Sequence, residues 1–236
     1  MKVGDDIEVA RASWTFGGDV AGTFVEHAAK SIPMYHEGHD IICSLSDFFV
    51  QPEGHCYEIG TSTGQLLRKL AEHNSHKANT VWVGLDREEP MIEKAREHCA
   101  DLENVELYAE DFLLHDMQKA DFIVSYYVMQ FVPPRLRQDA FDKIYDRLNW
   151  GGAFVLFEKV RGPDARFQDI TTNMYTNFKV ENGLTSDEIL NKTDSLKSVM
   201  EPFSTQGNID LLKRAGFVDV MTVCKWICFE GFLAIK

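Results

Sequence analysis

Strand and helix patterns alternate along the middle of the chain, and this alternation limits the possible folds more than any other feature. Short apolar runs of the kind that form buried strands are separated by stretches with apolar residues at helical spacing. The expected strands are 56–59, 80–85, 105–108, 121–126 and 153–160, and the expected helices between them are 65–73, 90–99 and 135–148. Strands and helices that alternate at this spacing predict a parallel sheet with helices on both faces.

The last third of the chain departs from this alternation. Residues 161–201 are expected to form helices inserted outside the sheet, and residues 208–215 form a further predicted helix. Two strands, 217–224 and 226–235, follow with little between them except Cys224-Lys225, a connection that requires antiparallel pairing. The predicted fold class is therefore α/β, with a Rossmann-like sheet of seven strands that is mostly parallel and ends in an antiparallel hairpin. This arrangement is typical of class I methyltransferases.

The residues before the alternation are expected to cover the sheet with helices. Helices are predicted over 19–31 and 40–50, and Pro33 and the turn at 51–54 end them. No repeat, low-complexity stretch or linker rich in proline and glycine divides the chain. We therefore expect residues 1–236 to form a single domain, with residues 1–52 as an N-terminal helical cover and residues 161–205 as a helical insertion.

Composition argues against several classes of protein. The chain has 37 acidic and 24 basic residues, and its net charge of −13 disfavours broad contact with nucleic acid or anionic lipid. No apolar run approaches the ~20 residues of a membrane span, and the first residues lack the apolar core of a signal peptide. Five cysteines without a CxxC pair favour a reducing compartment. We therefore expect a cytoplasmic protein that is neither a secreted mini-protein, nor a membrane protein, nor a general nucleic-acid binder.

A glycine-containing loop follows the first strand of the alternation. Glu58 is followed by Ile59 and then by Gly60-Thr61-Ser62-Thr63-Gly64, which opens the next helix. Glycines allow a sharp turn and a close approach of a ligand to the backbone. A pyrophosphate, which dinucleotide-binding loops hold at this place, would be repelled by Glu58, whereas a cationic group would be attracted. A tight turn without any ligand is the alternative interpretation.

Acidic residues follow three successive strands of the predicted sheet. Glu58 ends the first strand, Asp86 ends the second, where a carboxylate can accept hydrogen bonds from ribose hydroxyls, and Asp111 follows the third, near an expected adenine. Each acid alone is equally consistent with a turn or a helix cap. Together they indicate a nucleoside with a positively charged tail and no phosphate, which is S-adenosylmethionine (SAM). The predicted cofactor-binding residues are Tyr35, Glu58, Gly60, Thr61, Ser62, Gly64, Asp86, Arg87, Met91, Asp111, Phe112 and Tyr126.

Short segments spread over almost the whole chain carry a family resemblance. They include Trp14-Thr15-Phe16, Ser31-Ile32-Pro33-Met34-Tyr35, Tyr57-Glu58-Ile59-Gly60, Gln130-Phe131, Glu158-Lys159, Asn173-Met174, Phe178-Lys179 and Ala215-Gly216-Phe217. In these segments the sequence resembles the carboxy-S-adenosylmethionine synthase (CmoA) family within the class I methyltransferases. The resemblance implies a SAM-binding homodimer in which Tyr35, Asp86, Asp111 and the backbone after Glu58 surround the ligand.

One stretch of the insertion departs from that family. Its synthases carry Lys-Arg-Ser there, and the arginine binds the carboxylate that is added to the methyl carbon of SAM. This chain has Lys192-Thr193-Asp194 instead. The loss of such a charge-assisted contact is expected to cost about 1.5–3 kcal/mol. The family's asparagine after the fourth strand is also replaced, by Tyr126.

These departures predict plain methyl transfer from SAM to a small-molecule acceptor. The alternative is a carboxy-SAM synthase that uses SAM and prephenate, in which Arg161 or Arg166 replaces the missing arginine. A protein that binds SAM without catalysis is a third possibility, which the complete set of cofactor residues disfavours.

Aromatic and histidine side chains are the candidates for catalysis. Tyr35, Tyr126 and Tyr127 are expected to line the sulfonium of the methyl donor, because aromatic walls suit a cation; packing in the core is the alternative for Tyr127. His36 and His39 follow Tyr35, and a histidine there is a candidate general base, His36 being the one chosen; solvated loop histidines are the alternative interpretation. The spacing of His36 and His39 without a helix is poor evidence for a metal site, so none is predicted.

Overall fold

The computed structural model describes residues 2–3 and 20–236, without the side chains of residues 20–24. The segment Trp14-Thr15-Phe16 and the first residue of the helix predicted at 19–31 lie outside the described residues. In chain order, the elements are α1 (Val20–Ser31), α2 (Tyr35–Phe49), β1 (His55–Ile59), α3 (Gln65–His73), β2 (Val81–Asp86), α4 (Glu89–His98), β3 (Val105–Ala109), β4 (Ala120–Tyr126), η1 (Met129–Phe131), α5 (Pro134–Arg147), β5 (Leu148–Lys159), α6 (Ala165–Glu181), α7 (Ser186–Ser195), α8 (Thr205–Ala215), β6 (Asp219–Trp226) and β7 (Phe229–Ile235).

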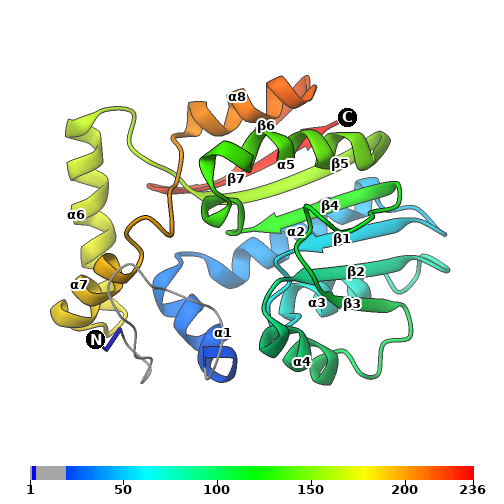
Figure 1. The fold of residues 1–236 in the computed structure, drawn as a ribbon, viewed down its shortest axis with the longest axis horizontal. Helices are drawn as coiled ribbons and strands as arrows, with labels where there is room; N and C mark the ends of the chain where they lie inside the picture. Colours follow the sequence, from blue (N-terminus) through cyan, green and yellow to red (C-terminus); the bar gives the residue numbers. More distant parts are fainter. Residues whose placement is uncertain (1, 4–19) are drawn as a thin grey trace.

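The strands form one sheet of seven strands in the order β3-β2-β1-β4-β5-β7-β6 (Figure 1). Strands β1 to β5 pair in parallel, and β7 pairs antiparallel with both β5 and β6. The predicted fold class is confirmed. From β1 the chain continues to β2 and β3 on one side, and it then returns to β4 and β5 on the other side of β1. The direction in which strands are added therefore reverses between β1 and β4. Ligands of open parallel sheets bind at such a reversal, beyond the carboxyl ends of the strands.

Apolar side chains cover both faces of the sheet, because its central strands are buried on both sides. On one face, Ile42 of α2 and Leu67 of α3 pack with Phe122 of β4. On the other face, Phe141 of α5 and Leu212 of α8 pack with other residues of the same sheet. The predicted N-terminal cover therefore contributes α2 to one of the two helical layers.

Several boundaries differ from the sequence predictions. Strand β5 begins at Leu148, five residues before its predicted start at 153. Helix α2 begins at Tyr35, five residues before the predicted start, since Met34 takes a left-handed conformation (φ 56°) from which the helix begins. Strand β6 continues to Trp226, so the hairpin turns at Ile227-Cys228, and the predicted turn at Cys224-Lys225 is wrong. A positive φ of 44° at Ile227 fits the two-residue turns that match the twist of paired strands.

The insertion after β5 forms helices, as predicted, and these lie beyond one end of the sheet. Figure 1 shows α6 and α7 together there, with α1 next to α7, and Tyr175 of α6 contacts Phe229 of β7 directly. The two inserted helices are well capped: Asp164 accepts a hydrogen bond from the Phe167 N–H at 3.1 Å, and Thr185 and Glu188 form a capping box. No helix in the described part of the chain is long and apolar enough to cross a membrane.

The turn after β1 requires glycine at position 60. Gly60 has a φ of +72°, and a Cβ atom there would lie 2.3 Å from Cγ2 of Val128. We predict that Gly60→Ala lowers the free energy of unfolding by about 2–5 kcal/mol, because left-handed strain adds to a steric clash. Urea denaturation measures this loss.

Gly151→Ala is the matched control for that variant. Gly151 has nearly the same φ, +77°, but no atom lies within 4 Å of its added Cβ. We expect only the conformational cost of about 1–2 kcal/mol at this position. Equal losses in the two variants would contradict the proposed clash at Gly60.

Candidate active site

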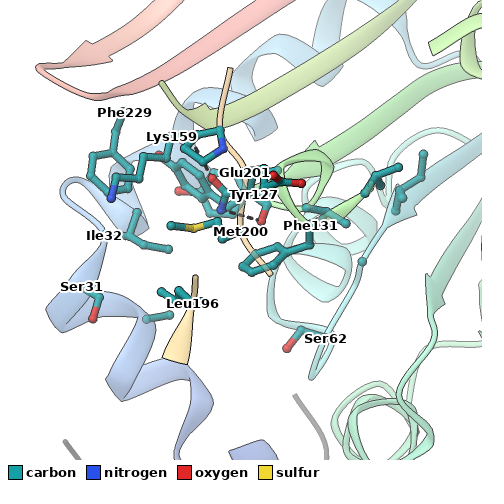
Figure 2. Close-up of a pocket in the computed structure, with 18 of the residues that line it drawn as sticks. Ser31, Ile32, Ser62, Tyr127, Phe131, Lys159, Leu196, Met200, Glu201 and Phe229 are labelled. Atoms are coloured by element: carbon teal, nitrogen blue, oxygen red, sulfur yellow. Dashed lines mark hydrogen bonds between the residues drawn. The ribbon is translucent and has the colours of Figure 1, made fainter. Parts of the chain in front are cut away.

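A cavity of about 1000 Å³ lies where the parallel strands end and the inserted helices begin. Its volume is at the upper end of the range for small-molecule sites. Figure 2 shows the walls: Ser31 ends α1 and Ile32 follows it, Ser62 lies on the glycine loop, and Tyr127 follows β4. The remaining labelled side chains come from β5, η1, β7 and the insertion: Lys159, Phe131, Phe229, Leu196, Met200 and Glu201.

The glycine loop is fastened to the end of β2. The N–H groups of Gly60 and Thr61 both donate to the carbonyl oxygen of Leu85, at 2.7 and 3.0 Å. Gly60, Thr61 and Ser62 line the cavity, as predicted. Gly64 does not: it lies behind the loop, where an added Cβ would be 3.1 Å from the Cβ of Ala95. Its place indicates a packing role, because α4 approaches the loop there.

Glu58 is fully buried in the wall of the cavity. One of its carboxyl oxygens accepts a hydrogen bond from the Thr61 hydroxyl at 2.7 Å. Burial, with a smaller contribution from the nearby Asp86, raises the pKa of Glu58 to about 8. A carboxyl group in this position is neutral at pH 7 and gains free energy from a cation placed beside it.

Asp86 shapes the loop as well as facing the cavity. Its carboxylate accepts hydrogen bonds from the backbone N–H of Ser62 at 2.9 Å and of Glu88 at 3.0 Å. Asp86 therefore has a structural role at the strand end as well as a place at the cavity. Burial raises its pKa. Each carboxylate oxygen accepts more than one hydrogen bond, so capacity remains for the hydroxyls of a ligand.

The other predicted cofactor residues beyond β2 and β3 also line the cavity. Met91 and Phe112 are buried, and the Met91 sulfur lies 3.5 Å from the Ser62 hydroxyl. Asp111 accepts a hydrogen bond from the Leu113 N–H at 3.0 Å, while Arg87 is exposed at the rim. The structure thus brings all three acids to one cavity, because parallel strands end at the same edge of the sheet.

The aromatic side chains of Tyr35, His39 and Tyr126 form a tight cluster at the end of β4, which neighbours β1 on the side away from β2. The ring centroids of Tyr35 and His39 lie 4.8 Å apart, those of His39 and Tyr126 4.9 Å, and Tyr126 donates to the Tyr35 carbonyl at 2.7 Å. Burial raises the pKa of both tyrosines, so both are neutral phenols at pH 7. Gly38 permits this packing, since a Cβ there would lie 2.2 Å from the Tyr126 hydroxyl. Both tyrosines line the cavity.

Tyr127 also lines the cavity, and it is buried. Its backbone has a positive φ of 62°, which is unusual for an aromatic residue, and its N–H donates to the Phe157 carbonyl at 2.8 Å. Strained backbone of this kind is concentrated at functional sites. Tyr127 therefore packs in the core, which was the alternative considered from the sequence, and also lines the cavity.

His36 is exposed and is not among the residues that line the cavity, so the structure does not support it as general base. It lies in the first turn of α2 rather than in a loop. His39, one turn later, lines the cavity, and burial lowers its pKa to about 4. His39 is four residues after Tyr35, and residues at this spacing share one face of a helix. The spacing indicates a shared place in the cavity wall only because the helix begins at Tyr35.

In the insertion, Thr193 lines the cavity, and its hydroxyl donates to the Ile189 carbonyl of its own helix at 2.8 Å. Asp194 is not part of the cavity wall and forms an ion pair with Lys197 at 2.5 Å. Of the two arginines considered as replacements for the missing family arginine, Arg161 lines the cavity. Arg166 is exposed and does not.

Sequence reasoning missed three cavity-lining residues near the insertion: Lys179, Tyr175 and Lys192. Lys192 lies within hydrogen-bond distance of the His27 ring, at 2.5 Å, and donates to the Ser31 hydroxyl at 2.8 Å. From the sequence, Lys159 has no role beyond its place in the family segment Glu158-Lys159. Glu158 is buried, whereas Lys159 faces the cavity. Among the described residues, no cluster of three or more side chains suited to a metal ion is found.

Comparison with known proteins agrees with this geometry. The model of a methyltransferase domain matches residues 57–154. A carboxy-S-adenosyl-L-methionine synthase of Staphylococcus epidermidis is 37% identical over 94% of this chain and 97% of its own length. The chain belongs to the carboxy-S-adenosyl-L-methionine synthase family. The synthase of Sulfurimonas denitrificans is 32% identical over 96% of both chains.

Solved structures show the same fold at low sequence identity. A methyltransferase of Methanococcus maripaludis has a TM-score of 0.61 at 17% identity and covers 97% of both chains. Human N-acetylserotonin methyltransferase, solved in complex with SAM, has a TM-score of 0.58 at 17% identity over 84% of this chain and 51% of its own. The predictions of a class I methyltransferase fold and of a SAM-dependent enzyme are confirmed at the level of the family.

Asp86 offers a direct test of the site. We predict that Asp86→Ala weakens SAM binding by roughly tenfold to a hundredfold, which corresponds to about 1.5–3 kcal/mol for a charge-assisted contact. It also lowers the free energy of unfolding, because the N–H groups of Ser62 and Glu88 lose their acceptor. Calorimetric titration and urea denaturation measure the two effects separately.

His36→Ala is the control, since this side chain is exposed outside the cavity. Its SAM affinity is expected to match that of the unmodified protein. If a folded Asp86→Ala variant bound SAM with unchanged affinity, Asp86 would not be a SAM-binding residue.

Proposed function

We propose that this chain transfers the methyl group of SAM to a small-molecule acceptor bound in the same cavity. The observation that carries the proposal is the buried Glu58 beside Asp86 and the glycine loop, because this set attracts a cation and offers acceptors for hydroxyl groups. The cavity volume of about 1000 Å³ supports the presence of a second molecule beside SAM.

The residues of the site fit SAM. Among the described residues, the Thr61 hydroxyl is the one side chain that hydrogen-bonds the carboxyl group of Glu58, so a cationic group there would offset the cost of its ionisation. Asp86 retains acceptor capacity for ribose hydroxyls, and Asp111 and Phe112 would lie beside the adenine. Tyr35 and Tyr126 would hold the donor end with aromatic surface.

SAM supplies an electrophilic methyl group on a sulfonium. The part of the chain in this reaction is to align the acceptor with that group and to exclude water, which can account for a large share of the rate. The rings of Tyr127 and Phe229 contact each other and form apolar surface in the cavity wall. No cavity residue is assigned as a required base: His39 is neutral and buried, and His36 lies outside.

Carboxy-SAM synthesis is the second candidate, favoured by the names of the relatives and by Arg161 on the cavity wall. Against it stands Thr193, which lines the cavity where the family's synthases have arginine and supplies no positive charge. Mass spectrometry of the nucleoside after incubation with SAM and prephenate decides between them. Robust formation of carboxy-SAM would overturn the methyl-transfer proposal.

Thr193→Arg tests the same position by gain of function. We predict that it raises the affinity for carboxy-SAM by about tenfold or more, since a new guanidinium would pair with the carboxylate and Asp194 is already paired with Lys197. Calorimetric titration with carboxy-SAM and SAM measures the preference.

Thr193→Met is the matched control, because it adds length without charge. It is expected to leave the preference for SAM unchanged. An equal gain in both variants would show that size rather than charge controls this position.

SAM binding should release a proton from Glu58. The carboxyl group is mostly protonated at pH 7, since its pKa is about 8, and a bound cation favours the ionised form. The affinity for SAM is therefore expected to rise as the pH increases from 6 to 8. Calorimetry in buffers with different ionisation enthalpies counts the released protons, and Glu58→Gln is expected to remove this release.

The homodimer implied by the family resemblance and the expected cytoplasmic location remain part of the proposal. So does the single-domain organisation, which is supported by the one sheet to which all described strands belong.

A further inference from the structure

Two lysines face one aromatic ring inside the cavity. Lys159 is the last residue of β5, while Lys179 and Tyr175 lie one turn apart on α6. The ammonium nitrogens of Lys159 and Lys179 each lie 4.4 Å from the centroid of the Tyr175 ring. The ring itself is held in place, because the Tyr175 hydroxyl donates to the Ser31 carbonyl at 2.9 Å and the ring packs against Phe229.

Neither ammonium group has a carboxylate partner within 4.0 Å among the described residues. Lys179 is only 6% exposed, and burial together with Lys159 lowers its pKa to about 8. Burial lowers the pKa of Lys159 too, and the nearby Arg161 adds to this effect. Burying a cation without a counter-ion is costly, and contact with an aromatic ring offsets only part of that cost.

The positive groups lie apart from Glu58 and Asp86, the acids beside the glycine loop. Figure 2 shows Lys159 on the side opposite Ser62, the loop residue that binds Asp86. An anion would therefore be attracted to the lysines and repelled from the glycine loop, so that two unlike ligands would each have one preferred place. Apolar side chains lie between the two regions: Ile32, Leu196, Met200 and Phe229.

We propose that Lys159, Lys179 and Tyr175 form a subsite for the methyl acceptor. The subsite binds the carboxylate of the acceptor next to the two lysines. This inference rests on the proposed methyl transfer and names the acceptor class: a small carboxylic acid with an apolar or aromatic body. The two ammonium groups pair with the carboxylate, the apolar side chains contact the body, and the far end of the acceptor points toward the methyl donor.

The test uses the full-length protein saturated with S-adenosylhomocysteine and a matched pair of probes. Benzoate carries a carboxylate, and benzamide has nearly the same shape without the charge. Ligand-observed NMR titrations are expected to show benzoate binding at least tenfold more tightly than benzamide. Equal binding of the two probes, or binding of inorganic phosphate as tight as that of benzoate, would overturn the proposal.

The lysines are tested with Lys159→Met and Lys179→Met, which keep the length of the side chain and remove its charge. Each is expected to weaken benzoate binding at least tenfold and to leave the affinity for S-adenosylhomocysteine within twofold. Lys213→Met, on the exposed surface of α8, is the control and should change neither. Unchanged benzoate binding in both cavity variants would also overturn the proposal.

Lys179→Arg separates charge from folding. It keeps the positive charge, and benzoate binding is expected to be largely retained, whereas a loss equal to that of Lys179→Met would contradict a charge-based subsite. If the unmodified protein binds no S-adenosylhomocysteine, the proposed methyl transfer fails. The benzoate and benzamide titrations on the ligand-free protein then still decide whether the anion subsite exists.

Discussion

The hydrogen bonds that fasten the glycine loop to the end of β2 are the contacts on which the whole site depends. Gly60 and Thr61 bind the Leu85 carbonyl, and Ser62 binds the Asp86 carboxylate. These bonds hold the carboxyl ends of β1 and β2 in a single wall and keep Glu58 buried beneath the loop. They add to the parallel strand pairing, which places the three acids at one edge of the sheet. The same carboxylate thus builds the loop and faces the ligand, so stability and binding are coupled at Asp86.

The cavity joins two environments that the sheet alone would not provide. At the strand ends it is acidic, with Glu58, Asp86 and Asp111, whereas the helices inserted after β5 bring Lys179 near Lys159. Opposite charges separated by an apolar middle suit a reaction between a cationic donor and an anionic partner. The insertion therefore contributes binding chemistry as well as a cover, and this explains why the helical segment matters to the proposed reaction.

Much of the fold could be predicted because its signals are local. The helix over Gln65–His73 has the predicted bounds, and the seven-stranded sheet with its antiparallel end followed from the alternation and the short final connection. The start of α2 could not be predicted, since it depends on a left-handed Met34. The position of the final turn depends on Ile227, a β-branched residue that sequence patterns do not associate with a positive φ.

The sequence by itself determined the fold class and the three acids at the strand ends, because hydrophobic periodicity and strand-end position are properties of neighbouring residues. Only the tertiary structure decided that His39 rather than His36 lines the cavity, that Gly64 packs against α4, and that Arg166 stays outside. It alone also placed Lys159 and Lys179 on one ring. A lysine is normally a surface residue, and its burial beside another cation arises only when the consecutive elements β5 and α6 pack around the same space.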